Sequence, residues 1–312
     1  DPMSVRGITF RDKEGNVAVT PERGFIDNLD EIPFPARELL PVDSYNASIS
    51  LGGGKPFTTI LATRGCPFDC HFCSLHSMWK GQRRRSVKNV LDEVEHLKRV
   101  FGIKYLNFAD DLLTLDKKWA MELFDGMLTR GLNDIKWDCN GRINVMSEEL
   151  LRKMKQANCR CISYGIEFGN QKIMDFSGKR LKISQVLETI RLTNKVGIPI
   201  ICLFMMGYPT ETEETLMDTI RLAMSLKMDY LAVSIVTPYP GTQLYEYCKE
   251  HNILKRKGWD NYDVLQLRHE AIELKHISLE ELLSYSIKIN RDFMMRPSYF
   301  VSKIGVKKYS FD

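Results

Sequence analysis

Apolar residues follow two different periods along most of the chain. From residue 57 onward, short runs rich in β-branched and aromatic residues alternate with longer segments in which apolar residues recur at helical spacing. In one such segment Ser86 precedes apolar positions from Val90 to Leu97, and we expect Ser86 to be the N-cap of a helix. The pattern predicts strands at 57–65, 105–110, 135–141, 160–167, 199–207 and 229–238, and helices at 86–101, 116–130, 147–157, 183–196 and 211–227.

The repeated order of strand then helix determines the expected fold class. Strands that are joined through helices pair in parallel, with right-handed crossovers. Six such units are fewer than the eight of a closed barrel, so the sequence predicts an α/β protein with a partial (β/α)6 TIM-like barrel over residues 51–241. In such a fold the chemistry takes place at the carboxyl ends of the strands, which is where the unusual residues of this chain lie.

Both flanks of the expected barrel differ from it in pattern. The segment VRGITFRDKEGNVAV, from residue 5, predicts two short strands around the turn Glu14-Gly15-Asn16. Prolines at 21, 33, 35 and 41 exclude a long helix between residues 20 and 45 and predict an extended strap. We interpret residues 1–50 as a hairpin and proline-rich strap that link to a further domain, because neither is stable without a neighbour. Residues 242–312 are expected to form a helical extension.

Composition places the chain among ordinary globular proteins. It has 312 residues, with 44 Lys and Arg against 40 Asp and Glu, and a net charge of +4. No basic stripe extends beyond Arg83–Arg85, which we expect to form a solvated loop, so nucleic acid is not the expected partner. The apolar run at 198–206 is shorter than the roughly 20 residues that cross a bilayer, and no signal-peptide pattern begins the chain. The sequence therefore predicts a cytoplasmic protein without a transmembrane segment.

Three of the eight cysteines lie close together, directly after the first expected strand. Cys66, Cys70 and Cys73 form the pattern C-x3-C-x2-C. Three thiolates in one loop can bind a zinc ion with His71 or His76 as the fourth ligand, or three irons of a [4Fe–4S] cluster. Zinc ligands usually come from two separated pairs, whereas here one loop at the mouth of a barrel supplies them all, which favours the cluster. Four other cysteines fall inside strands and are expected to be small buried hydrophobic residues: Cys139, Cys159, Cys161 and Cys202.

The cysteine loop resembles that of the radical S-adenosylmethionine (SAM) superfamily. The superfamily has the same cysteine spacing after the first strand of a six-unit partial barrel, with an aromatic residue before the last cysteine, where Phe72 stands here. The resemblance implies that Cys66, Cys70 and Cys73 hold three irons of a [4Fe–4S] cluster, and that the fourth iron binds the amino and carboxylate groups of SAM. It further implies reductive cleavage of SAM to methionine and a 5′-deoxyadenosyl radical.

The resemblance also implies contacts for the other groups of SAM. Asp110 and Asp111 stand where the superfamily has an acid-containing motif that receives the amino group, although the glycines of that motif are missing here and a helix N-cap is the alternative. Glu167, at the end of the fourth expected strand, is implied to bind the ribose hydroxyls. Arg142 is implied to pair with the methionyl carboxylate, with a surface ion pair as the alternative.

Two further strand ends are implied to contact the adenine. Gly207 permits a close backbone approach after the fifth strand, and Pro209 fixes a turn before a helix that we expect to begin at Thr210. Val236 and Pro238 are implied to complete an apolar wall after the sixth strand. Turn chemistry at the rim of a barrel explains these glycine and proline residues equally well.

Segments beyond the cysteine loop resemble the class of radical SAM proteins that carry a cobalamin-binding domain before the barrel. They are LDEIPFPARELLP, FADDLLT, YGIEFGNQKIM, MMGYPTET, TPYPGTQLYE and MMRPSYF. The resemblance implies a C-methyltransferase or a cyclase, with a small-molecule or lipid-like substrate and a reducing electron donor such as flavodoxin or ferredoxin. Cobalamin is expected only in a longer protein, because the D-x-H-x-x-G motif of that domain is missing here. The alternative function is that of a structural zinc-binding or adapter protein.

Overall fold

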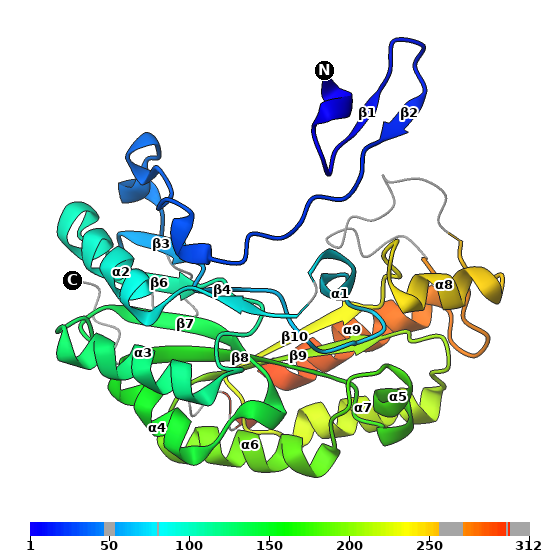
Figure 1. The fold of residues 1–312 in the computed structure, drawn as a ribbon. Coiled ribbons are helices and arrows are strands. Elements are labelled where there is room, and N and C mark those ends of the chain that lie inside the picture. Colours follow the sequence, from blue (N-terminus) through cyan, green and yellow to red (C-terminus); the bar gives the residue numbers. More distant parts are fainter. Residues whose placement is uncertain (47–53, 80, 256–270, 298, 300–312) are drawn as a thin grey trace.

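The centre of the fold is a six-stranded parallel sheet in the order β10-β9-β8-β7-β6-β3 (Figure 1). The structure, a computed structural model, describes residues 1–46, 54–79, 81–255, 271–297 and 299. The strands are β3 (Phe57–Ile60), β6 (Tyr105–Phe108), β7 (Lys136–Gly141), β8 (Cys159–Glu167), β9 (Ile200–Met206) and β10 (Tyr230–Ile235). Each strand pairs with the next of this series, and β3 and β10 are the two edges. The sheet is therefore an open barrel, which confirms the predicted fold class.

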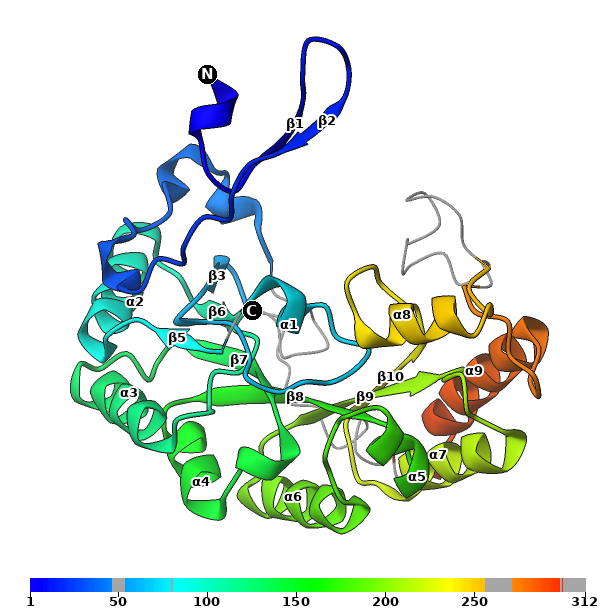
Figure 2. The same cartoon turned by 45° about the vertical axis from the view of Figure 1, so that its right-hand side comes forward.

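Helices connect the strands along the outer side of the curved sheet (Figure 2). They are α2 (Val87–Phe101), α3 (Lys117–Thr129), α4 (Glu148–Gln156), α6 (Ile183–Val196) and α7 (Glu213–Ser225). Ser86 is the N-cap of α2, as predicted, because its Oγ accepts a hydrogen bond from the Asn89 amide at 3.1 Å. Two short helices, α1 (Leu75–Met78) and α5 (Gln171–Phe176), were not among the predicted elements. Both lie near the carboxyl ends of the strands.

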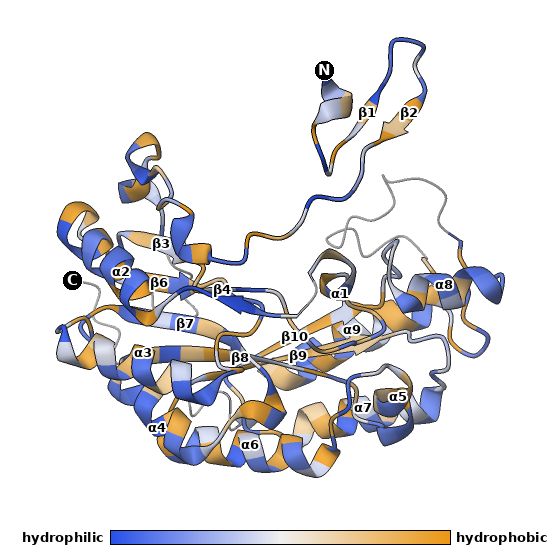
Figure 3. Ribbon diagram, in the orientation of Figure 1, coloured by the Kyte–Doolittle hydropathy of each residue, from blue (hydrophilic) through white to orange (hydrophobic). Residues whose placement is uncertain are grey.

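The main core lies between the sheet and these helices, whose apolar stripes face the strands (Figure 3). Trp137 of β7 stacks on Phe124 of α3 with ring centroids 5.1 Å apart, and Phe108 of β6 meets the same indole edge-on at 5.4 Å. All three side chains are fully buried, so this aromatic cluster fixes α3 against the middle of the sheet. The four strand cysteines are also buried, which confirms the prediction that they are small hydrophobic residues: Cys139, Cys159, Cys161 and Cys202.

The first predicted strand, 57–65, is wrong in its length. Only β3 belongs to the sheet, and the chain then leaves it to form β4 (Thr63–Arg64), which pairs antiparallel with β5 (Arg83–Arg84). The break has a physical cause, because the buried Asp110 carboxylate accepts hydrogen bonds from the amides of Ala62 and Thr63 and turns that backbone away from β6. The prediction that residues 83–85 form a solvated loop is also wrong, since two of them make β5 and the Arg85 side chain is only 10% exposed.

The amino-terminal segment forms the predicted hairpin and strap. β1 (Thr9–Arg11) pairs antiparallel with β2 (Val17–Val19), and the hairpin projects away from the barrel (Figure 1). The strap contains only single turns of 3-10 helix, η2 (Leu29–Glu31), η3 (Arg37–Leu39) and η4 (Val42–Ser44), as its prolines require. Val42 is buried in the main core, so the strap packs on the barrel itself. The predicted boundary between strap and barrel, at residues 50 and 51, lies outside the described residues.

The carboxyl-terminal segment is mostly helical where it is described, and its other described residues include an antiparallel bridge between Leu254 and Ile272. α8 (Gln243–Glu250) and α9 (Leu279–Met294) fit the predicted extension, while residues 256–270, 298 and 300–312 of that prediction lie outside the described part of the chain. The helix after β9 begins later than predicted, because Thr212 and not Thr210 is its N-cap, with its Oγ1 accepting from the Thr215 amide at 3.4 Å. Within the described ranges, no helix is long and apolar enough to cross a membrane.

Candidate functional site

The cysteine loop starts at Gly65, directly after β4, and the chain returns from it to β5, the other strand of the short ribbon. Gly65 has a φ of +89°, and a Cβ at this position would overlap the carbonyl oxygen of Gly81. Its amide donates a hydrogen bond to Asp111 Oδ2 at 3.0 Å. Only glycine therefore fits this turn, which delivers Cys66 to the carboxyl-end side of the sheet.

Backbone contacts hold the middle of the loop between α5 and α8. The His71 amide donates to the Ser177 carbonyl at 2.9 Å, and the His71 carbonyl accepts from the Leu244 amide at 2.8 Å. The side chain of Gln243 also donates to Asp69 Oδ1 at 2.8 Å. These bonds come from elements that follow two different strands, so the loop lies across the mouth of the open barrel.

The three cysteines of the loop carry free thiols in a partly desolvated place. Cys70 is 8% exposed, and Cys66 and Cys73 are half-buried. Burial raises the pKa of the Cys66 and Cys73 thiols, while the charge of Arg142 acts in the opposite direction on Cys66 and that of Lys179 does so on Cys73. The site thus places two cations beside thiols that would become thiolates on binding iron.

Arg142 follows the end of β7 and lies under the loop. Its guanidinium stacks on the Phe68 ring at 3.7 Å, and Nη1 is 3.7 Å from Cys70 Sγ. Nη2 donates to the Lys179 carbonyl and Nε donates to Asn144 Oδ1 at 2.9 Å. Arg142 is only 7% exposed, so the alternative of a surface ion pair is wrong. A buried guanidinium without a carboxylate partner of its own in the described chain has charge to offer an anionic group.

Glu167 ends β8 in an unusual backbone conformation. Its φ is +74°, which is strained for a residue with a side chain, and such strain is concentrated at functional sites. The Glu167 carboxylate is paired with Lys179 at 2.9 Å, and the two side chains are 11% and 9% exposed. A Cβ at Gly165 would lie 2.5 Å from Glu167 Oε1 and 3.0 Å from Lys179 Nζ, so Gly165 makes the room that this ion pair occupies.

Lys179 was not a predicted site residue. It follows Gly178 in a connection without hydrophobic period, where a lysine is usually solvated. The available signal was the glycine two residues before Glu167, on the same face of the strand, which indicated that something bulky approaches there. This glycine indicated where another group approaches the strand, but it did not identify that group as Lys179.

Asp110 and Asp111 have different places in the structure. Asp110 is fully buried against the backbone amides of Ala62 and Thr63, and desolvation raises the pKa of its carboxyl group to about 6. Asp111 contacts the amide of Gly65, next to Cys66. Both carboxylates therefore shape the start of the cysteine loop, and their expected contact with the amino group of SAM stays a prediction.

Of the residues expected around the adenine, Val236 belongs to a second apolar cluster. Val236 is 1% exposed and belongs to the same cluster as Phe168, with Phe72 packed against it. The Phe72 and Phe168 rings meet edge-on at 6.3 Å. Gly207 has a φ of +87° and directly precedes Tyr208 of this cluster, and Pro238 is buried two residues after Val236. The cluster is an apolar wall beside the cysteine loop, and its contact with adenine stays a prediction.

The zinc alternative finds no site among the described residues. Among the residues that the structure describes, no group of three His, Cys, Asp or Glu side chains converges closely enough to hold a single metal ion. The His76 side chain is 54% exposed and lies 4.0 Å from Asp69. A [4Fe–4S] cluster makes a different demand, because each thiolate binds its own iron. The geometry therefore gives no support to the zinc alternative.

Comparisons with known proteins agree with this geometry. The family profile described as the Radical SAM superfamily matches residues 60–223. The chain is 35% identical over 302 residues to an uncharacterized methyltransferase of Pyrococcus horikoshii, which covers 96% of this chain and 63% of that protein. It is 35% identical over 240 residues to the anaerobic magnesium-protoporphyrin IX monomethyl ester cyclase of Cereibacter sphaeroides, which covers 76% of this chain and 38% of that protein.

A solved structure shares the fold. The radical S-adenosylmethionine methyltransferase TsrM of Kitasatospora setae, solved with cobalamin and a [4Fe-4S] cluster, aligns with a TM-score of 0.59 at 20% sequence identity, over 78% of this chain and 47% of that one. The chain thus spans less than two thirds of each of these relatives. The family profile nevertheless covers more than half of the chain, including the cysteine loop and five of the six parallel strands in whole or in part. The chain is a member of the radical SAM superfamily.

Proposed function

We propose that this chain binds a [4Fe–4S] cluster through Cys66, Cys70 and Cys73 and uses it on SAM. The observation that supports this most directly is the position of all three thiols on one loop across the carboxyl ends of a parallel sheet, beside two buried cations. When bound, the cluster supplies the electron that cleaves SAM reductively to methionine and a 5′-deoxyadenosyl radical. We propose flavodoxin or ferredoxin as the class of electron donor.

The residues around the loop have distinct proposed tasks. Arg142 offsets the negative charge of the thiolates and attracts the methionyl carboxylate, because its guanidinium has no carboxylate partner among the described residues. Glu167 binds the ribose hydroxyls, and Lys179 holds its carboxylate in place and charged. Phe72 and Val236 exclude water from the apolar side of the nucleoside.

The proposed reaction of the whole protein is a C-methylation or a cyclisation on a small-molecule or lipid-like substrate. Its support is the names of the relatives, one a methyltransferase and one a magnesium-protoporphyrin ester cyclase. We further propose that the complete reaction uses a cobalamin bound by another domain of a longer protein, to which residues 1–50 link. The hairpin supports this, because its valines Val17 and Val19 are 61% and 70% exposed without a partner surface in the described chain.

Anaerobic reconstitution tests the cluster. We expect the reconstituted protein to contain four irons and four sulfides per chain, to bind SAM, and to release 5′-deoxyadenosine with a strong reductant. Cys70→Ala should lose the cluster, whereas Cys202→Ala, at a buried cysteine in β9, should keep it. Iron and sulfide counts decide between the outcomes, and a full cluster in Cys70→Ala would contradict the proposal.

Cobalamin titration tests the larger scheme. We expect this chain, reconstituted with its cluster, to cleave SAM without binding cobalamin tightly or forming the methylated or cyclised product. A longer protein that contains the chain should do both. Tight cobalamin binding by this chain alone would contradict the proposed division of tasks, while leaving the cluster proposal intact.

A further inference from the structure

β3 is the last strand on one side of the sheet, and among the described residues no strand pairs with its outer edge. The Ile60 carbonyl faces β6 and accepts from the Ala109 amide at 2.9 Å. Alternate carbonyls of a strand point the other way. The carbonyl groups of Thr59 and Leu61 therefore lie on the open edge of β3. An uncovered edge of this kind can pair with a strand of another chain, so other groups of the protein usually cover it.

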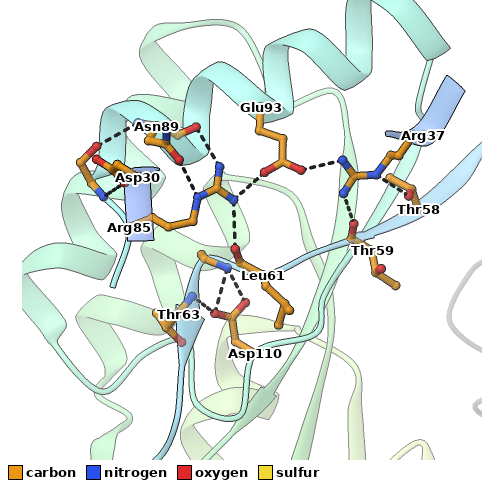
Figure 4. A network of polar contacts seen from close by, with 12 residues as sticks. Asp30, Arg37, Thr58, Thr59, Leu61, Thr63, Arg85, Asn89, Glu93 and Asp110 are labelled. Atoms are coloured by element: carbon orange, nitrogen blue, oxygen red, sulfur yellow. Dashed lines mark hydrogen bonds and ion pairs between the residues drawn. The ribbon is translucent and has the colours of Figure 1, made fainter. Parts of the chain in front are cut away.

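Two arginines from distant parts of the chain cover this edge and meet at one carboxylate (Figure 4). Arg37, in the strap, donates Nη2 to the Thr59 carbonyl at 2.7 Å. Arg85, after β5, donates Nη1 to the Leu61 carbonyl at 3.0 Å. Glu93 of α2 lies between them, with Oε1 2.6 Å from Arg37 and Oε2 2.5 Å from Arg85. Exposed fractions of 7%, 10% and 1% for Arg37, Arg85 and Glu93 show that water is largely excluded from this triad.

The same contacts continue into the start of the cysteine loop. The Arg85 amide donates to the Ala62 carbonyl at 3.0 Å, and the Ala62 amide donates to Asp110 Oδ1 at 3.1 Å. Three residues later, the Gly65 amide donates to Asp111 Oδ2 at 3.0 Å. After Ile60, which still pairs with β6, the backbone from 61 to 65 is thus fixed by side chains and by the small ribbon of β4 and β5, and not by pairing within the main sheet. The Thr59 carbonyl, which Arg37 binds on the outer edge of β3, lies directly before this stretch.

We propose that Arg37 is a positioning residue for the cysteine loop, and that the strap which carries it is part of the barrel wall. Its fork binds three acceptors at once: Thr59, Glu93, and the hydroxyl of Thr58 at 3.2 Å. Without it the Thr59 carbonyl has no donor and Glu93 keeps a single cation, so that segment 59–65 opens more often. The inference rests on the proposed function only in taking the loop to hold a cluster.

The test compares three variants with the wild type. Arg37→Gln removes the charge and most of the fork. Arg37→Lys keeps a cation for Glu93 but cannot bind Thr58 and Thr59 at the same time. If Arg37→Gln does not fold, Arg37→Lys can still be measured. Arg130→Gln is the control. Arg130, at the end of α3, binds Asp92 and Glu95 of α2 at 29% exposure, and its ion pairs include neither Glu93 nor a residue of β3.

Two measurements report on the loop itself. Hydrogen exchange of the apoprotein should be about tenfold faster or more in the peptide spanning 59–66 for Arg37→Gln, and less so for Arg37→Lys, with β8 and β9 unchanged. Iron release to a chelator from the reconstituted protein should accelerate by a similar factor. The control should match the wild type in both measurements.

Unchanged exchange at 59–66 in both Arg37 variants would overturn the inference, as would equal acceleration in the Arg130 control. A uniform increase over the whole sheet would also overturn it, because it would show a general loss of stability. If the wild type took up no cluster, the proposed function would fail, and the exchange measurement would still decide whether Arg37 positions the loop.

Discussion

The buried ion pair between Glu167 and Lys179 allows the structural and the ligand-binding roles of Glu167 to be separated. In Glu167→Gln, Lys179 keeps its charge at 9% side-chain exposure without a counter-ion. Removal of one partner from such a desolvated pair lowers the free energy of unfolding by about 3–5 kcal/mol. In the double variant Glu167→Gln with Lys179→Met, no uncompensated charge remains, and we expect most of this loss to be recovered.

SAM affinity should behave differently from stability. If Glu167 binds the ribose, its substitution removes a charged hydrogen bond worth roughly 1.5–3 kcal/mol, which is about a tenfold to hundredfold weaker affinity. The second substitution restores no carboxylate, so the double variant should remain weak in SAM binding although its stability returns.

The assays are urea unfolding of the apoproteins and equilibrium dialysis of SAM against the reconstituted proteins. Glu188→Gln is the control, because Glu188 is 54% exposed and its pair with Arg191 lies on the outer helix α6. The reasoning would be refuted if SAM affinity recovered together with stability in the double variant, since Glu167 would then act only through the fold. Unchanged affinity in the single variant would refute it as well.

Three further predictions follow from burial and backbone conformation. Desolvation raises the pKa of the Glu211 carboxyl group from about 4.5 to about 7, so the unfolded state loses this proton at lower pH than the folded state does. The free energy of unfolding should therefore fall by about 3 kcal/mol as pH rises between these two values. Glu211→Gln should remove this pH dependence from unfolding curves recorded at pH 4.5 to 7.5. Gly65→Ala should lower the free energy of unfolding more than Gly131→Ala does, because Gly131 also has a positive φ but has open space around it. We expect Gly131→Ala to cost about 1–2 kcal/mol by thermal unfolding. Equal costs for the two variants would contradict the steric argument at Gly65. Trp137→Ala should cost about 3–5 kcal/mol in the same assay, because its indole is fully buried, and a cost below 1 kcal/mol would contradict the assigned core.

The order of strands and helices could be predicted because hydrophobic period is a local property of the sequence. α6 lies over the predicted residues 183–196, and the other main helices begin or end within a few residues of their predicted limits. The first strand could not be bounded in the same way. Its end depends on Asp110, almost fifty residues later, whose carboxylate competes with β6 for the amides of Ala62 and Thr63. The hydrophobic pattern of residues 57–65 alone gives no sign of this contact with Asp110.

The residues of the candidate site differ in the same way in how far the sequence could predict them. The three cysteines share one short loop, so their spacing was visible in the sequence, as was Glu167 at the end of a strand. Lys179 and Arg37 were not visible, because each acts through a partner on another element, Glu167 on β8 and Glu93 on α2. Both are cations inside the fold, where an isolated charge is costly and a paired one is specific.

The cysteine loop depends on both local and remote residues. Its thiols are supplied by a local motif, but the charge around them and the backbone that leads to them depend on remote residues. Arg142 and Lys179 come from beyond β7 and α5, and Arg37 comes from the strap. A segment with the same cysteine spacing, taken out of this barrel, would keep its three thiols and lose the two cations and the fixed edge of β3. We therefore expect a peptide of residues 59–79 to bind a cluster less tightly than the whole chain does, and equal retention of iron by the two against a chelator would show that the loop needs no support from the barrel.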